Sequence, residues 1–238
     1  MLYLHRRKII FNILFTLSFL SLYGQGRMNN INYDGLKKKN HYFGLTLGYN
    51  YSSFKIEHSK RLIDNSTFKI NEGIGNPGLT LSVITNFKLG EYFDYRLLPS
   101  ISLGYRKLTY APTNGGPLQE DLLESVFGEI PMLIRYTSAP YRDKKMFILG
   151  GVKYAYDFAS NSRSDKSRFD IVRISPHDFQ FEIGAGLQFF LPFFIFTPEI
   201  KFSHGLNNLL IYDGKLIEST IIDKLYSKTW TISFHFEG

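Results

Sequence analysis

Alternating apolar and polar residues run through two long segments between positions 177 and 210, which are separated by a tight turn. The apolar face of the first segment comprises Phe179, Phe181, Ile183, Ala185, Leu187 and Phe189. Its opposite face comprises Asp178, Gln180, Glu182, Gly184, Gly186 and Gln188. Because successive side chains of a strand point to opposite sides, this pattern predicts two paired strands with one apolar and one polar face.

The second segment repeats the pattern. Its apolar face comprises Phe194, Phe196, Ile200, Phe202 and Leu206, and its polar face Thr197, Glu199, Lys201, Ser203 and Asn207. A face rich in phenylalanine opposite one of glycines and opposed charges is typical of a transmembrane β-barrel, with lipid outside and a polar, packed interior. The alternative is a soluble lipocalin-like barrel, which turns its apolar face inward.

Residues 1–24 have the three parts of a secretory signal peptide. A basic stretch at residues 6–8 precedes an apolar stretch at residues 9–22, and Gly24 followed by Gln25 is the expected cleavage site. The alternative is a membrane anchor, but the apolar run is shorter than the roughly 20 residues that a spanning helix needs. We expect residues 25–40 to form a periplasmic tail and residues 41–238 to form the barrel.

Composition excludes several functions. The chain has no cysteine, which rules out disulfides, thiolate catalysis and cysteine metal sites. Its formal charge of +7 falls to +4 once the three basic residues of the signal peptide are removed. The bases do not cluster on one face with interleaved aromatics, so we expect no nucleic-acid partner.

Eight strands are expected in all. They cover residues 42–56, 78–89, 93–110, 123–137 and 145–159, two strands within 177–210, and residues 225–237. Long connections follow the first, third, fifth and seventh strands, and short turns follow the others. This arrangement predicts an eight-stranded antiparallel outer-membrane barrel with both termini in the periplasm. Pro99, Pro131 and Pro198 fall inside strands, where each should mark a bulge or a missing ladder bond.

An eight-stranded barrel is only wide enough inside for its own side chains. The charged residues expected to face inward are Arg96, Arg106, Glu129, Arg135, Lys153, Glu182, Glu199 and Lys201. Buried charges must be paired, so we expect a salt-bridge network that fills the lumen. The alternative is a catalytic or transport site that uses Glu129 and Glu182.

No other residue pattern indicates chemistry. His177 and Asp178 are adjacent at a strand mouth, so their side chains should point to opposite faces, and His204 should point outward. The sequence lacks the common phosphate-binding, zinc-protease and hydrolase motifs. We therefore expect no catalytic residue, cofactor, metal or small-molecule substrate.

Several segments, taken in order, resemble the PorT family of the Bacteroidetes type IX secretion system, called SprT in gliding bacteria. They include YFGLTLGYNYSSFKI, FGEIPMLIRYTSAPY and PHDFQFEIGAGLQFFLPFF, and the most specific is FTPEIKFSHGLNNLL at residues 196–210. The likeness extends from about residue 40 to the C-terminus. It implies an outer-membrane barrel, surrounded by lipid and in contact with other type IX proteins, that is needed for protein secretion and in some members for gliding motility. The alternative is a free-standing small barrel that acts as an adhesin or envelope stabiliser.

Overall fold

The computed structural model describes residues 32–34, 39–58, 68–112, 119–159, 173–211 and 222–238. The expected signal peptide and most of the expected tail lie outside these residues. Among the residues that are described, no helix is both long and apolar enough to cross a membrane.

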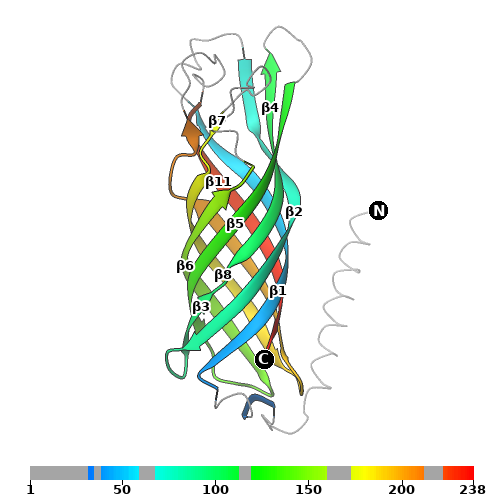
Figure 1. The fold of residues 1–238 in the computed structure, drawn as a ribbon, viewed down its shortest axis with the longest axis vertical. Helices are drawn as coiled ribbons and strands as arrows, with labels where there is room; N and C mark the ends of the chain where they lie inside the picture. The colour runs from blue at the N-terminus through cyan, green and yellow to red at the C-terminus, as the bar shows by residue number, and fades with distance from the viewer. Residues whose placement is uncertain (1–31, 35–38, 59–67, 113–118, 160–172, 212–221) are drawn as a thin grey trace, which may run out of the picture.

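Antiparallel strands dominate the fold and wind around a common axis (Figure 1). The strands are β1 (His41–His58), β2 (Phe68–Lys88), β3 (Phe93–Leu97), β4 (Ser100–Pro112), β5 (Gln119–Thr137), β6 (Lys144–Asp157), β7 (Arg173–Ile174), β8 (His177–Phe190), β9 (Ile195–Gly205), β10 (Leu210–Ile211) and β11 (Ile222–Glu237). Apart from the small β7–β10 pair, the strands form one continuous hydrogen-bonded sheet. Within it β3 and β4 each pair with β2 and β5, and β1 pairs with both β2 and β11. The sheet therefore closes into a ring, which confirms the predicted barrel.

The third strand of the ring consists of β3 and β4, so the ring has eight strands among the described residues. Leu98 and Pro99 separate the two halves, yet Leu97 pairs with Met132 and Ser100 pairs with Glu129, so the register does not shift. Proline has no N–H to donate, and the interruption is a missing ladder bond. The registers around Pro131 and Pro198 are likewise continuous, so none of the three prolines marks a bulge.

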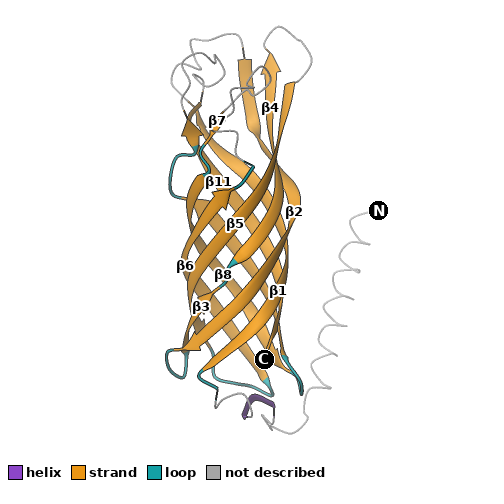
Figure 2. Cartoon of the chain, viewed as in Figure 1, coloured by secondary structure: helices purple, strands orange, loops and turns teal. Residues whose placement is uncertain are grey.

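The two ends of the barrel differ. At the terminal end, which we define as the end where β1 begins and β11 ends, short turns join β2 to β3, β5 to β6 and β8 to β9. At the opposite loop end, β2, β4 and β5 rise above the neighbouring strands (Figure 2). Residues 68–71 of β2 pair with residues 109–112 of β4, whereas the sequence predicted a polar loop up to residue 76. Residues 68–71 do alternate, as Phe-Lys-Ile-Asn, but glycines and Pro77 interrupt the pattern before the next apolar run.

The outer wall carries an aliphatic band between two belts of aromatic side chains. Leu45, Leu81, Ile101, Ile148 and Ile183 belong to the band, and each is about half exposed or more. The belt toward the terminal end includes Phe87, Tyr92, Phe93, Tyr95, Tyr136, Phe189, Phe196 and Phe236. The belt toward the loop end includes Tyr154, Tyr156, Phe179, Phe181, Phe202, Tyr226 and Trp230. An apolar band between two aromatic girdles is the surface that a membrane-spanning barrel presents to lipid.

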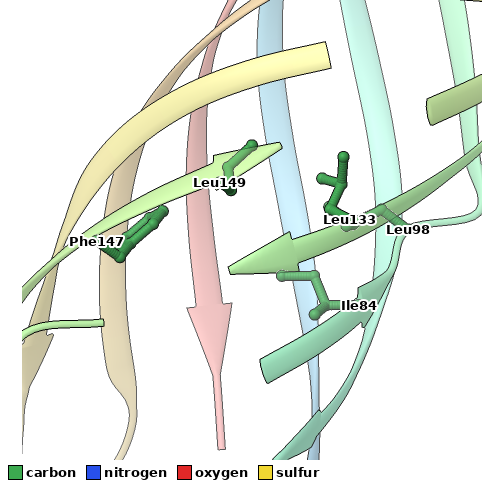
Figure 3. Packing of buried hydrophobic residues seen from close by; sticks show 5 residues of the cluster. All are labelled: Ile84, Leu98, Leu133, Phe147 and Leu149. Carbon is green, nitrogen blue, oxygen red and sulfur yellow. The ribbon is translucent and has the colours of Figure 1, made fainter. Parts of the chain in front are cut away.

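The interior also holds an apolar cluster, which the sequence analysis did not predict. Ile84, Leu98, Leu133, Phe147 and Leu149 are at most 6% exposed and project from β2, the β3–β4 link, β5 and β6 (Figure 3). Each of these residues is next in sequence to an apolar residue that faces outward. A short run of consecutive apolar residues was therefore the sequence signal that could have predicted the cluster. The neighbouring strand β8 makes room for Phe147, since a β-carbon on its cross-strand partner Gly186 would lie 2.4 Å from the Phe147 ring.

Candidate functional site

The lumen contains a continuous ladder of charged side chains centred on Glu182 of β8. Its carboxylate accepts a hydrogen bond of 2.8 Å from the Ser203 hydroxyl and lies 3.3 Å from Lys153 Nζ and 3.5 Å from Lys201 Nζ. Lys153 also donates to Glu129 at 3.2 Å. The two carboxylates that could have formed a catalytic pair therefore share one lysine between them. Neither carboxylate is left unpaired, and removing one member would leave an uncompensated charge in the lumen.

Toward the terminal end the ladder continues through Glu199 of β9. Lys201 Nζ lies 3.8 Å from its carboxylate, His235 Nε2 lies 3.2 Å away, and Arg96 Nη1 lies 3.9 Å away. Arg96 in turn donates to both carboxylate oxygens of Glu237, at 2.8 and 3.0 Å. This bidentate pair is fully buried, and it lies between the last strand and the third strand of the ring.

A second cluster of charges closes the terminal end of the lumen. The Arg135 guanidinium donates through Nε to Asp94 at 2.9 Å, and its Nη2 donates to the Tyr42 hydroxyl. Its cationic carbon lies 5.1 Å above the Phe147 ring, which joins this cluster to the apolar one.

The structure thus brings together six of the eight predicted lumen residues in one ladder, namely Arg96, Glu129, Lys153, Glu182, Glu199 and Lys201. Arg135 lies in the neighbouring cluster with Asp94, and the side chain of Arg106 lies outside the described residues. The sequence analysis omitted three partners, Asp94, His235 and Glu237. The signal for the last two was the alternation of β11, whose inward positions continue through His235 to Glu237.

Neither His177 nor His204, both on the outer wall, takes part in this network. The Tyr154 hydroxyl lies 2.8 Å from Nδ1 of the outward His177, whereas the adjacent Asp178 is buried in the lumen and accepts a 2.6 Å hydrogen bond from Ser227. The two side chains therefore lie on opposite faces of the wall, as expected. His204 also lies outside, against Phe181 and Tyr226.

A cavity of about 570 Å³ opens at the terminal end, and part of the chain before the barrel lies against it. Its walls include Tyr42, Lys88, Arg135 and Lys145. Tyr33, from a single helical turn at residues 32–34, also lines the cavity and is only 8% exposed. This turn is the purple segment below the barrel in Figure 2.

Tyr33 is held by both stacking and hydrogen bonds. Its ring makes an edge contact with Phe190, 5.0 Å between centroids, and Lys145 Nζ lies 4.5 Å above it. The backbone N–H groups of Asn32 and Tyr33 each donate to Asp143 Oδ1 at 3.1 Å. Asn32 Nδ2 also donates to the Phe190 carbonyl at 3.0 Å. The N-terminal turn is therefore docked on the barrel by specific contacts.

The turn between β5 and β6 presents the Asp143 carboxylate. Tyr141 and Lys144 exchange backbone hydrogen bonds of 2.8 and 3.0 Å, which closes a two-residue loop. Both loop residues, Arg142 and Asp143, have positive φ angles, 48° and 53°. This is the backbone of a type I′ hairpin, which matches the twist of the flanking strands and which aspartate tolerates better than most residues.

We expect the replacement of Tyr33 by alanine to release the docked turn. Loss of the buried ring removes about 2 kcal/mol of apolar contact, which raises the undocked population at least tenfold. Trypsin cleavage at Lys37, Lys38 or Lys39 of the folded protein should become faster by a similar factor. Tyr141→Ala is the matched control, because Tyr141 lies in the neighbouring turn and is 59% exposed. Equal cleavage rates in both variants would show that Tyr33 does not hold the segment.

Together these features are those of a membrane-spanning antiparallel barrel with a filled lumen. Comparison with known families gives the same result: the model of the outer membrane protein beta-barrel domain matches residues 25–210, more than three quarters of the chain. The chain belongs to this family and is an outer-membrane β-barrel protein. No curated protein matches it.

Solved structures of several small outer-membrane proteins are similar to the chain. Ail of Yersinia pestis, crystallised with the heparin analogue sucrose octasulfate, is 16% identical, with 84% of this chain and 100% of that chain covered and a TM-score of 0.39. OprG of Pseudomonas aeruginosa is 10% identical, with 84% and 97% covered and a TM-score of 0.49. Neisserial surface protein A is 8% identical, with 83% and 97% covered and a TM-score of 0.42.

Proposed function

We propose that the protein is a closed, non-enzymatic barrel that passes no solute and works through the ends it presents outside the lipid, as a free-standing adhesin or envelope stabiliser. The observation that carries this proposal is the filled lumen. Apolar and charged side chains occupy the described interior from the Arg135 cluster at one end to Leu209 and Leu225, both at most 1% exposed, at the other. Because such packing leaves no path through the described lumen, the protein would act through the surfaces by which it contacts other molecules.

The proposed orientation puts the terminal end in the periplasm and the loop end at the cell surface. The short turns support it, because outer-membrane barrels have short periplasmic turns and long outer loops. In this orientation the raised ends of β2, β4 and β5 form a platform for contacts with other surfaces, and the Tyr33 turn and its cavity face the periplasm.

A second candidate function is a role in type IX secretion. The resemblance of residues 196–210 to the PorT family favours it, and their structure gives the motif a physical role. Asn207 accepts from Phe179 N at 2.7 Å and donates to the His177 carbonyl at 2.9 Å. Asn208 accepts from Leu210 N at 3.0 Å and Leu225 N at 2.9 Å. The motif therefore ties the segment after β9 to β8 and β11, and the docked Tyr33 turn would offer a contact for a partner protein.

Deletion of the gene distinguishes the two candidates. For a free-standing barrel, we expect adhesion or detergent resistance to fall while proteins secreted to the medium stay at wild-type levels. If cargo instead accumulates in the periplasm, the secretion role is correct and the first proposal is wrong. A His177→Ala copy should complement, because His177 holds no charged partner in the described structure, whereas a copy truncated before Trp230 should not, because the barrel cannot close. Steady conductance of the purified protein in planar bilayers would contradict both candidates, since each assumes a closed lumen.

A further inference from the structure

A small group of polar side chains, three of them basic, lies on the lipid-facing wall among the aromatic residues of the belt toward the loop end. We call it the basic rim and define it as Lys55 of β1, His204 of β9, and Tyr226 and Lys228 of β11. Lys228 is the cross-strand partner of His204, and Lys55 is the partner of Tyr226. The His204 and Tyr226 rings are 6.0 Å apart.

The basic rim carries a positive charge that the described residues do not neutralise. Lys55 and Lys228 are exposed, and neither forms an ion pair within the described part of the chain. Glu57 is the nearest outward carboxylate on β1, and it is already paired with Lys224 at 3.6 Å. Lys55 and Lys228 are diagonal neighbours on adjacent strands. Long side chains at such positions can reach one another, so both ammonium groups can contact the same anion.

The position of the basic rim relative to the membrane indicates what that anion is. The next outward residue of β11 is Trp230, which contacts Phe202 with ring centroids 4.8 Å apart and pairs with Tyr51 across the sheet. Aromatic belts lie at the level of the lipid head groups. Lysines within this belt extend their ammonium groups into the head-group layer, while their methylene stems stay against the wall.

We propose that the basic rim is a binding site for the phosphate of a membrane lipid. Lys55 and Lys228 would each donate a charge-assisted hydrogen bond to the phosphate oxygens, and the Tyr226 hydroxyl would add a neutral one. The acyl chains of the same lipid would lie along the aliphatic band below Trp230. The proposal rests on the membrane-spanning fold and is independent of which proposed function is correct.

Trp230 is the only tryptophan of the chain, so its fluorescence reports directly on the lipid beside the rim. The full-length protein is reconstituted in phosphatidylcholine vesicles that contain a fixed fraction of bromine-labelled phosphatidic acid or of bromine-labelled phosphatidylcholine. Bromine quenches tryptophan on contact. We expect phosphatidic acid to quench several-fold more efficiently than phosphatidylcholine. Because the two leaflets have the same lipid composition, the result does not depend on the orientation of the barrel.

Lys55→Gln combined with Lys228→Gln should make the two lipids quench equally, and Lys55→Arg combined with Lys228→Arg should keep the preference. Lys144→Gln is the matched control, because Lys144 is an exposed outward lysine at the terminal end, above the Phe189 ring. The proposal is wrong if wild type shows no preference or if the double glutamine variant retains it. It is also wrong if millimolar inorganic phosphate abolishes the preference, since the site would then take a free anion.

Discussion

Replacement of Glu182 by glutamine is expected to lower the free energy of unfolding by about 3–5 kcal/mol, the usual cost of breaking a buried ion pair. Glutamine keeps the volume and one hydrogen-bond acceptor for Ser203, so the effect isolates the charge. Glu182 lies between Lys153 at 3.3 Å and Lys201 at 3.5 Å, and its side chain is 2% exposed. Without it, each ammonium keeps a single carboxylate, Glu129 or Glu199, in a lumen that excludes bulk water.

The measurement is urea unfolding of the protein reconstituted in lipid vesicles, followed by the fluorescence of Trp230. Glu57→Gln is the matched control, because Glu57 also pairs with a lysine, Lys224 at 3.6 Å, but its side chain is 43% exposed. An exposed pair contributes about 1 kcal/mol at most. If the two variants lost the same free energy, the ladder would not be a buried network.

Arginine at position 183 is expected to destabilise the folded protein by about 2–4 kcal/mol, because it puts a charge against lipid near the middle of the membrane. Ile183 is 54% exposed on the outer wall and lies in the aliphatic band of β8, between Phe181 and Phe189. Ile232 of β11, which is 46% exposed, should respond in the same way. The same unfolding assay measures both losses.

Leu206→Arg provides the depth control. Leu206 is 58% exposed, like Ile183, but it follows the end of β9 at the loop end. Near the interface the cost of arginine falls to about 0–1 kcal/mol, because the guanidinium reaches the head groups. A cost that did not differ between positions 183 and 206 would contradict the proposed lipid-facing band. A negligible cost at position 183 would contradict the inside–outside assignment of β8.

Period-two alternation was sufficient to predict the barrel from the sequence. In β8 and β11 nearly every residue has a face that its polarity alone identifies, because one side meets lipid and the other meets a packed polar interior. The positions of the turns followed from the same pattern: the sequence predicted a turn at residues 138–144, and the structure has residues 138–143 between β5 and β6. The strands were predicted less well where lipid does not act on them, as in the first residues of β2.

Which charges meet was decided only by the tertiary structure. Glu182, Lys153 and Glu129 come from β8, β6 and β5, and Arg96 meets Glu237 from the opposite end of the sequence. Alternation fixes the face of each residue but not its height or its neighbour across the lumen, which depend on register and on closure of the ring. Closure between β1 and β11 also brings Lys55 beside Lys228, and it is the reason that the basic rim exists.

The docked N-terminal turn also shows the difference between what the sequence determined and what the tertiary structure decided. The sequence by itself determined a membrane barrel with lipid outside, because lipid and a narrow lumen impose opposite polarities on alternate residues of every strand. Only the tertiary structure decided that the Tyr33 ring contacts Phe190. It also decided that the Asp143 carboxylate accepts hydrogen bonds from the backbone N–H groups of Asn32 and Tyr33. Such contacts join segments more than a hundred residues apart, and local sequence carries no signal for partners that meet only after the barrel closes.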